Sequence, residues 1–171
     1  KNIFLKKNLV QSGSKVYVSQ FLKYEKENPS DIIEIHNRPN YFHLINSFKK
    51  NQKLVLYFHN DPLTMTGSRS VADRKRLLEN ATKIIFNSHW SRKRFLEGIT
   101  GFHINSEKMT VIYQSTKPSK VNIYNKKNWI TFVGKLNRAK GYDLFGKAVL
   151  KILKKYKNWK AIVIGDEPRM T

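Results

Sequence analysis

Cysteine is absent from this chain of 171 residues. Its absence excludes a disulfide framework and a thiolate metal site, and it permits a reducing compartment. Long apolar runs are also absent, since no stretch approaches the roughly 20 residues that a helix needs to span a bilayer. Acidic residues are few, with 12 Asp and Glu against 33 Lys and Arg. The hydrophobic fraction of 40% is nevertheless typical of a globular protein with a sizeable core.

The formal net charge of +21 resembles that of a nucleic-acid-binding protein. The basic residues are spread along the whole chain, however, and they comprise 25 Lys against 8 Arg. Proteins that read nucleic acid favour Arg forks and local basic clusters. We therefore attribute the charge mainly to overall composition and disfavour nucleic acid as a partner. An anionic membrane surface or an anionic substrate stays open as an alternative.

Short apolar runs alternate with helical patterns, which favours βαβ units and a mostly parallel sheet. The predicted strands are 15–22, 31–35, 53–58, 83–86, 109–113, 129–133 and 159–164. The predicted helices are 39–50, 70–81, 89–97 and 142–156, the last with Leu144, Phe145, Ala148, Val149 and Ile152 facing the sheet. The continuous apolar run 53–58 predicts a strand buried on both faces. The polar, aperiodic stretch 116–128 predicts a connection between two domains.

The most informative pattern lies in residues 129–143. An apolar strand ends at Gly134, Lys135 and Lys140 follow five residues apart, and Gly141 opens an amphipathic helix. Glycines let a ligand approach the backbone, and a strand-to-helix turn offers free N–H groups to phosphate oxygens. The lysines add point charges at the carboxyl end of a strand, where open α/β sheets bind ligands. The pattern predicts a diphosphate site, with an ordinary solvated turn as the alternative; it matches neither a Walker loop nor G-x-G-x-x-G.

Two histidines occupy equivalent positions at the ends of successive strands. His59 follows the predicted strand 53–58, and His36 follows 31–35. An imidazole there can donate to a hydroxyl or phosphate oxygen, or move a proton near neutral pH. The alternative for His59 is packing against Tyr57 or bonding to Asp61. Polar residues that accompany the histidines at this predicted cleft edge are Asn37, Arg38, Asn60 and Asp61.

Other reactive constellations are not found in the sequence. The histidines lack the i, i+4 spacing of a helix-borne metal pair, and no G-x-S-x-G nucleophile elbow occurs. We therefore expect no metal site. Ser88 is interpreted as the N-cap of helix 89–97, which leaves little need for a substrate role of His89. The basic clusters 74–76 and 92–94 are interpreted as solvated helix faces, with contact to an anionic membrane as the alternative.

Six segments in chain order resemble motifs of glycosyltransferase family 4, the retaining group 1 transferases of the GT-B fold. Residues 31–37 (D-I-I-E-I-H-N) resemble D-V-I-H-x-H, and 54–61 (L-V-L-Y-F-H-N-D) resemble x-x-T-x-H-D/N. Residues 83–91 (K-I-I-F-N-S-H-W-S) resemble V-I-A-x-S-x-x-x, and 108–113 (K-M-T-V-I-Y) resemble the strand of K-I-x-V-I-x-N-G. The family's N-G-V/I-D after this strand is replaced here by residues 113–116 (Y-Q-S-T). Residues 132–141 (F-V-G-K-L-N-R-A-K-G) resemble x-V-G-R-L-x-x-x-K-G, the most specific of the six. Residues 161–168 (A-I-V-I-G-D-E-P) resemble L-x-I-V-G-x-G-P.

The resemblance implies an α/β, GT-B-like architecture. Residues 1–115 would form the acceptor-side Rossmann-like domain, incomplete at its N-terminus, and 116–128 would link it to the next domain. Residues 129–171 would supply the first βαβ of a truncated donor domain. The family's Gly-rich loop is not visible before residue 15, and its paired glutamates (E-x-x-x-x-x-x-x-E) would lie beyond residue 171. We therefore expect a fragment that is inactive alone.

The same resemblance implies a function for the parent enzyme. It would transfer a hexose (EC 2.4) from a nucleotide sugar, with retention, to a glycan or lipid-linked acceptor in bacterial cell-envelope polysaccharide synthesis. Gly134, Lys135, where the family has Arg, and Lys140 would bind the donor diphosphate, and His59 would lie beside the donor sugar or phosphate.

Gly165 and Asp166 would form a further donor loop, and His36, Asn37, Arg38, Asn60 and Asp61 would face the acceptor or cleft. No metal or other cofactor is expected. The location would be cytoplasmic, with peripheral contact at the inner face of an anionic membrane. The alternatives are a non-catalytic basic module that binds nucleic acid or anionic lipid, and a non-transferase GT-B protein such as an epimerase.

Overall fold

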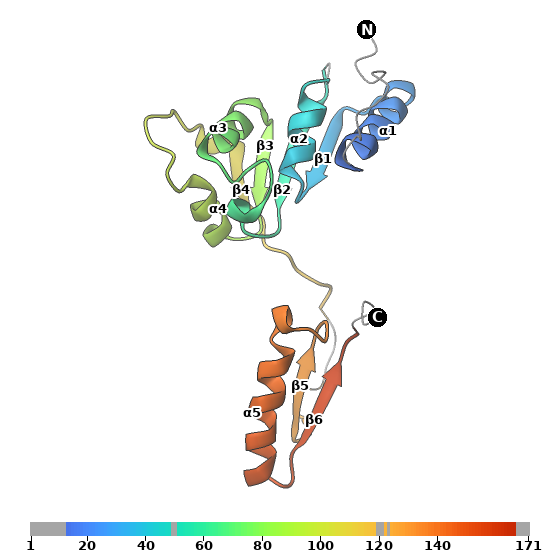
Figure 1. Cartoon of the computed structure of the whole chain (residues 1–171), viewed down its shortest axis with the longest axis vertical. Coiled ribbons are helices and arrows are strands. Elements are labelled where there is room, and N and C mark those ends of the chain that lie inside the picture. The colour runs from blue at the N-terminus through green and yellow to red at the C-terminus, as the bar shows by residue number, and fades with distance from the viewer. Residues whose placement is uncertain (1–12, 49–50, 119–121, 123, 167–171) are drawn as a thin grey trace. The chain divides into compact units, whose positions relative to one another are not determined.

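The chain divides into two compact units, Lys1–Thr116 and Lys117–Thr171. A computed structural model describes residues 13–48, 51–118, 122 and 124–166 (Figure 1). The division falls at the start of the stretch that the sequence predicts to be a connection. Each unit has its own parallel sheet, so each is described by itself.

The first unit is built on a four-stranded parallel sheet with the strand order β1-β2-β3-β4. Its strands are β1 (Ile32–His36), β2 (Lys53–Phe58), β3 (Lys83–Phe86) and β4 (Met109–Val111), which agree with the predicted strands. The connecting helices are α2 (Pro39–Asn46), α3 (Val71–Asn80) and α4 (His89–Leu96). Because each strand is added on the same side of the previous one, right-handed crossovers place these helices on a single face.

Burial of the strand side chains shows which face carries the core. In β2, Leu54, Leu56 and Phe58 are fully buried, whereas Val55 and Tyr57 on the opposite face are only half-buried. The expectation that this strand is buried on both faces was therefore wrong, because the helices between the strands cover one face. The buried residues that pack around this side of the sheet include Ile33, Ile35, Phe42, Leu77, Ile84, Phe86 and Phe95.

Residues 15–22 are helical and not a strand, which corrects the sequence prediction. They belong to α1 (Gly13–Glu27). Val18 and Glu25 are buried, and Phe21 and Leu22 pack against the core. This is the i, i+3, i+4, i+7 spacing of one helix face. The β-branched valines near the start of the segment imitate strand alternation, but the longer period decides the structure.

The ends of the remaining helices follow local capping. Ser70 and Ser88 accept hydrogen bonds from the backbone N–H groups of Asp73 and Ser91, which caps α3 and α4. The predicted helix 39–50 is shorter, because α2 ends at Asn46. Residues 49 and 50 of that prediction lie outside the described residues. Within the described ranges, no helix is both long and apolar enough to cross a membrane.

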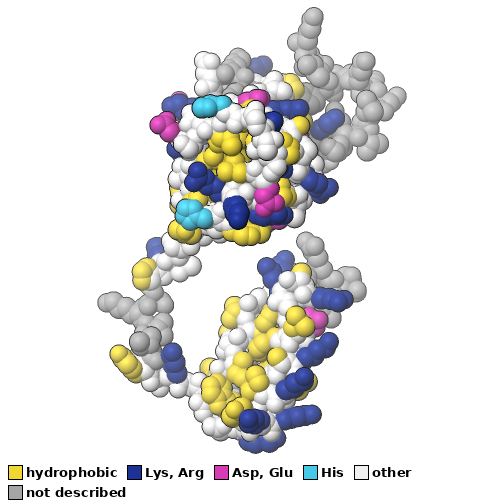
Figure 2. Space-filling model, turned by 90° about the vertical axis from the view of Figure 1, so that its left-hand side faces the viewer, with side chains coloured by type: hydrophobic (Ala, Val, Ile, Leu, Met, Phe, Trp, Pro, Cys, Tyr) yellow, Lys and Arg dark blue, Asp and Glu magenta, His cyan; other side chains and the backbone are white. Residues whose placement is uncertain are grey.

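The second unit is a single βαβ. Strands β5 (Trp129–Val133) and β6 (Lys160–Ile164) are parallel neighbours, joined through a short 3₁₀ turn (Arg138–Lys140) and helix α5 (Tyr142–Lys155). The helix packs through Phe145 and Val149, and the Phe132 ring lies 5.3 Å from that of Phe145, between centroids. Apolar and lysine side chains share the outer surface of this unit (Figure 2).

The predicted sheet-facing set on α5 was only partly right. Phe145 and Val149 contact the sheet side, but Leu144 is 65% exposed and Ile152 is 37% exposed. Ala148 is exposed as well. At 100° per residue the sheet-facing positions follow 142, 145, 149 and 153, so Leu144 and Ala148 lie on another face.

Candidate functional site

The carboxyl edge of the first sheet brings the two predicted histidines together. Nδ1 of His36 lies 2.8 Å from Nε2 of His59. The two rings stack with centroids 5.1 Å apart, and the Tyr57 ring stacks on His59 at 4.4 Å. The predicted juxtaposition is present, and the alternative packing of His59 on Tyr57 is present with it.

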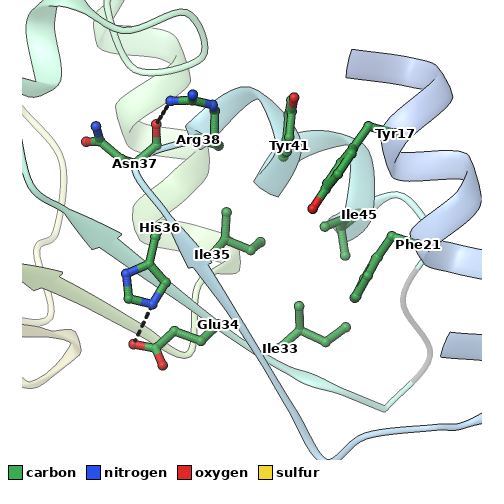
Figure 3. Close-up of a pocket in the computed structure, with 10 residues that line it drawn as sticks. All are labelled: Tyr17, Phe21, Ile33, Glu34, Ile35, His36, Asn37, Arg38, Tyr41 and Ile45. Atoms are coloured by element: carbon green, nitrogen blue, oxygen red, sulfur yellow. Dashed lines mark hydrogen bonds and ion pairs between the residues drawn. The ribbon is translucent and has the colours of Figure 1, made fainter. Parts of the chain in front are cut away.

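These imidazoles belong to a continuous row of polar contacts from Glu34 to Gln114. The Glu34 carboxylate lies 3.4 Å from Nε2 of His36 (Figure 3), and the Gln114 side-chain nitrogen lies 2.8 Å from Nδ1 of His59. A carboxylate only accepts, so Nε2 of His36 carries its proton, and Nδ1 then accepts from Nε2 of His59. Nδ1 of His59 in turn accepts from Gln114. This assignment, made from the hydrogen-bond network, uses every ring nitrogen with both imidazoles neutral.

The electrostatic setting of His59 favours its neutral form. Burial lowers the pKa of His59 below its ordinary 6.5, and the neighbouring His36 lowers it further. The Glu34 carboxylate opposes these effects. The lowered pKa favours the uncharged imidazole at neutral pH, in agreement with the assignment in which its single N–H, on Nε2, is donated to His36.

Backbone and amide groups hold this edge together. Asn37 adopts a left-handed conformation (φ 56°), which Asn tolerates better than most residues. Its Oδ1 accepts from the His59 backbone N–H at 3.3 Å, and Asn87 Nδ2 donates to the His59 carbonyl at 2.7 Å. Asn87 and Gln114 were missed in the sequence. The available signal for Asn87 was its position directly after β3, equivalent to that of His59 after β2.

The predicted residues of this edge do not all lie in one place, because those that follow β1 line a cavity and those that follow β2 do not. His36, Asn37 and Arg38 line a cavity of about 630 Å³ between α1, β1 and α2, with Tyr17 and Phe21 projecting toward it from α1 (Figure 3). The Arg38 guanidinium donates to the Asn37 carbonyl at 3.0 Å. The other apolar and aromatic residues that line this cavity include Ile33, Ile35, Tyr41 and Ile45.

Asp61 stabilises a loop and does not bond to His59, which was one of the alternatives predicted for that histidine. Its carboxylate accepts from the Leu63 backbone N–H and pairs with Arg94 at 3.1 Å. Partial burial would raise the pKa of Asp61, but the hydrogen bonds from Arg94 and Leu63 outweigh it and lower the pKa. Asn60 is exposed beside it. Asp61 thus anchors the loop after β2 to α4.

The basic clusters on α3 and α4 are not the free faces expected from the sequence. Arg74 is only 2% exposed and donates to the carbonyls of Ser68, Arg69 and Glu97. Arg94 pairs with Glu97 at 2.6 Å as well as with Asp61. Because these guanidinium groups serve internal acceptors, the two helices offer less free positive charge than their sequences indicate.

In the second unit, close backbone contacts join the ends of β5 and β6. The Gly134 N–H donates to the Ile164 carbonyl at 3.0 Å, and the Leu136 N–H donates to the Asp166 carbonyl at 3.4 Å. A Cβ at Gly165 would overlap the carbonyl oxygen of Gly134. The predicted donor loops 134–141 and 165–166 therefore lie side by side, and glycine at 165 is required for their approach.

The two predicted phosphate-binding lysines are exposed at this end of β5. A Cβ at Gly134 would lie 4.0 Å from Cβ of Lys140, which places the base of that lysine over the glycine. Asn137 caps the 3₁₀ turn by accepting from the Lys140 N–H, and Gly141 (φ 75°) turns the chain into α5. Within the described part of the chain, no carboxylate forms an ion pair with Lys135 or Lys140. Both charges are thus available to an anionic ligand.

A metal centre was not expected from the sequence. Among the residues that the structure describes, no group of three or more His, Cys, Asp or Glu side chains is arranged to hold a metal ion. The histidine edge offers the polar row from Glu34 to Gln114, and the glycine–lysine loop offers exposed positive charge.

Comparisons with known proteins address the second unit most directly. Residues 114–170, which are 57 of the 171, match the family model of glycosyl transferases group 1. No curated protein matches the chain. The 132–141 and 161–168 motifs both fall within the matched segment. Residues 167 and 168 of the second motif lie outside the described residues.

Two solved structures share the fold. The Anabaena Alr3699/HepE structure, in complex with UDP and glucose, is 18% identical with a TM-score of 0.58, and the alignment covers 95% of this chain and 47% of that one. Accessory secretory protein 1, 2 and 3 of Streptococcus pneumoniae is 9% identical with a TM-score of 0.53, covering 90% and 36%. This chain thus spans about a third to a half of those structures. The predicted GT-B-like α/β class is confirmed, and the C-terminal third of the chain is similar to group 1 glycosyl transferases.

Proposed function

We propose that the chain is part of a retaining family 4 glycosyltransferase. The enzyme would move a hexose from a nucleotide sugar to a glycan or lipid-linked acceptor in bacterial cell-envelope synthesis, at the cytoplasmic side of the membrane. The observation that carries the proposal is the loop from Gly134 to Gly141. It lies in the segment that matches group 1 glycosyl transferases and presents two exposed lysines at the carboxyl end of β5.

The loop suits a diphosphate for two physical reasons. Glycine at 134 and 165 keeps side chains away from the point where the ends of β5 and β6 meet, so a ligand can approach the backbone. The ammonium groups of Lys135 and Lys140 supply positive charge without an internal carboxylate partner among the described residues. In the transfer step they would stabilise the negative charge that develops on the departing nucleoside diphosphate.

His59 is also assigned a role in the proposed transfer. Its neutral imidazole would donate a hydrogen bond from Nε2 to the donor sugar or to a phosphate oxygen, and for this the N–H would have to leave Nδ1 of His36. No nucleophilic side chain is required, because the acceptor hydroxyl would attack on the face from which the diphosphate leaves. The departing phosphate would take the proton of that hydroxyl, and the reaction would proceed without a metal.

Titration calorimetry with UDP, GDP and ADP tests the donor site. Lys135→Ala/Lys140→Ala removes two charge-assisted contacts and is expected to weaken binding of the preferred nucleotide by at least about 100-fold. The matched control Lys151→Ala/Lys154→Ala removes equal charge from α5 and is expected to bind like the parent chain. Equal weakening in both variants, or no binding of any nucleoside diphosphate, would contradict the proposal.

The same variants separate the transferase from a non-catalytic basic module. Retention on DNA that depends on salt and is unaffected by Lys135→Ala/Lys140→Ala, with no nucleotide binding, would favour the basic module. We expect the reverse pattern. The chain alone is expected to show no sugar transfer or hydrolysis with any nucleotide sugar, and measured turnover would contradict that expectation.

A further inference from the structure

The segments that follow β1, β3 and β4 each send a polar side chain to His59, which follows β2. Asn37, directly after β1, accepts from the His59 backbone N–H at 3.3 Å, and Asn87, directly after β3, donates to the His59 carbonyl at 2.7 Å. Gln114, three residues beyond the end of β4, lies 2.8 Å from Nδ1 of the ring. Support from several elements of this kind fixes the orientation of a functional side chain.

Two contacts decide which ring nitrogen of His59 carries the proton. At Nε2 the partner is Nδ1 of His36, which accepts because Glu34 takes up the other N–H of that ring (Figure 3). At Nδ1 the partner is the side-chain nitrogen of Gln114, which only donates. Both contacts require the same tautomer, with the proton of His59 on Nε2.

The two contacts differ once a ligand engages the ring. A hydrogen bond from Nε2 of His59 to a sugar or phosphate oxygen requires that this N–H leave Nδ1 of His36. The link to Glu34 through His36 is then broken, and the Gln114 amide is the contact that still fixes the tautomer. Without that amide, a neutral imidazole can carry its proton on either nitrogen. In the Nδ1–H form it would present a lone pair to the ligand, and the donor would be lost.

The backbone that carries Gln114 is itself anchored to the sheet. The Ile112 N–H donates to the Phe86 carbonyl at 2.9 Å, and the Tyr57 hydroxyl donates to the Ile112 carbonyl at 2.7 Å. The Tyr57 ring also stacks on the ring of His59, with centroids 4.4 Å apart. The Gln114 side chain therefore reaches His59 from a backbone segment that is held two residues earlier.

We propose that Gln114 is a positioning residue for His59. Its amide donates to Nδ1 and keeps the single ring proton on Nε2, so that the imidazole can donate to a sugar or phosphate oxygen of the nucleotide sugar. The identity of this ligand rests on the proposed function, whereas the effect of Gln114 on the ring does not. The alternative is a purely structural amide, which would hold the segment after β4 without deciding where the ring proton lies.

Substitutions of Gln114 test the proposal in the background His36→Leu, which leaves Nε2 of His59 without its imidazole partner. Gln114→Glu places a group that only accepts at Nδ1, so the proton of the neutral ring should move from Nε2 to Nδ1. Gln114→Lys retains a donor and should keep the proton on Nε2. Long-range ¹H–¹⁵N spectra of the ¹⁵N-labelled chain, recorded above the pKa of the ring, distinguish a protonated ring nitrogen from a bare one.

Titration of the same variants gives a second measurement. A carboxylate beside Nδ1 favours the imidazolium, so Gln114→Glu should raise the pKa of His59 by about one unit or more. Gln114→Lys brings a like charge to the ring and should lower that pKa. The matched control is Gln20→Glu, the same chemical change at an exposed position of α1. It is expected to leave both the pKa and the tautomer of His59 unchanged.

A proton that stays on Nε2 in His36→Leu/Gln114→Glu would overturn the proposal and assign the amide a structural role. Shifts of the His59 pKa in the same direction in the Glu and Lys variants would overturn it as well. Because Gln114 is exposed, these variants are expected to remain folded, which circular dichroism verifies. The ring is measured without nucleotide, so a failure of the chain to bind any nucleoside diphosphate would contradict the proposed function separately.

Discussion

Replacement of Gly165 by alanine is expected to destabilise the second unit and to disrupt its donor loop. The added Cβ would overlap the Gly134 carbonyl oxygen, so the ends of β5 and β6 would have to separate. Separation strains the hydrogen bonds from Gly134 to Ile164 and from Leu136 to Asp166. Overpacking alone costs about 1–3 kcal/mol, and each weakened hydrogen bond adds up to about 1 kcal/mol. The free energy of unfolding of this unit should therefore fall by about 2–4 kcal/mol.

Gly146 provides the matched control within the same unit. It lies inside α5, and a Cβ there would meet no atom within 4 Å. Gly146→Ala is therefore expected to stabilise the unit by about 0.5–1 kcal/mol, because alanine is the better helix former. The two Gly→Ala substitutions should change stability in opposite directions.

Tryptophan fluorescence during urea unfolding can follow the second unit alone. Trp129 and Trp159 belong to it, and Trp90 belongs to the first unit. Trp90 is 58% exposed, so Trp90→Phe removes its signal with little effect on packing. In this background, an unchanged urea midpoint for Gly165→Ala, or a shift of the same sign in Gly146→Ala, would refute the reasoning about the close approach of the two loops.

Three further predictions concern the first unit, each measured by urea unfolding. Gly67→Ala is expected to destabilise it by more than about 2 kcal/mol, because its φ is +92° and its Cβ would lie 2.5 Å from the Asn40 backbone nitrogen; an unchanged midpoint would contradict this. Arg74→Met leaves three carbonyl groups without their donor and should cost about 3 kcal/mol, whereas exposed Arg76→Met should cost less than about 0.5 kcal/mol; similar losses would refute the buried role. The unfolded state protonates His59 near pH 6.5 and the folded state only at lower pH, so stability should decrease as pH falls from 7.5 to 5.5, and less so in His59→Gln; equal pH dependence in both proteins would contradict the assignment.

Local sequence patterns were sufficient for most strands and for the histidine edge. The apolar run of β2 and the parallel order of the strands place His36 and His59 at the same edge of the sheet, and their rings do meet. Residues 15–22 of α1 were predicted to be a strand, because Val16 and Val18 occupy alternate positions as in a strand. Val18, Phe21 and Leu22 already have the i, i+3, i+4 spacing of a helix, but Glu25, which continues it, could not be recognised as buried because it is charged.

Contacts between residues distant in sequence could not be predicted. The amide of Gln114 reaches His59 across 55 residues, and Arg74 finds its acceptors only where the loop 68–69 and the end of α4 meet. Burial on α5 could not be predicted from the apolar stripe, because the two-stranded sheet covers only a narrow part of the helix. Leu144 belongs to the apolar stripe but lies outside the part that the sheet covers.

The claim that most needs testing is that Lys135 and Lys140 bind the diphosphate of a nucleotide. At 20.1 kDa the chain suits ¹H–¹⁵N correlation spectra recorded during titration with UDP or GDP. We predict that the amide signals of Gly134, Lys140 and Gly141 shift first and saturably, and that Lys135→Ala/Lys140→Ala abolishes those shifts. Saturable shifts confined to the basic helices α3 and α4, with the signals of the loop unchanged, would contradict the account.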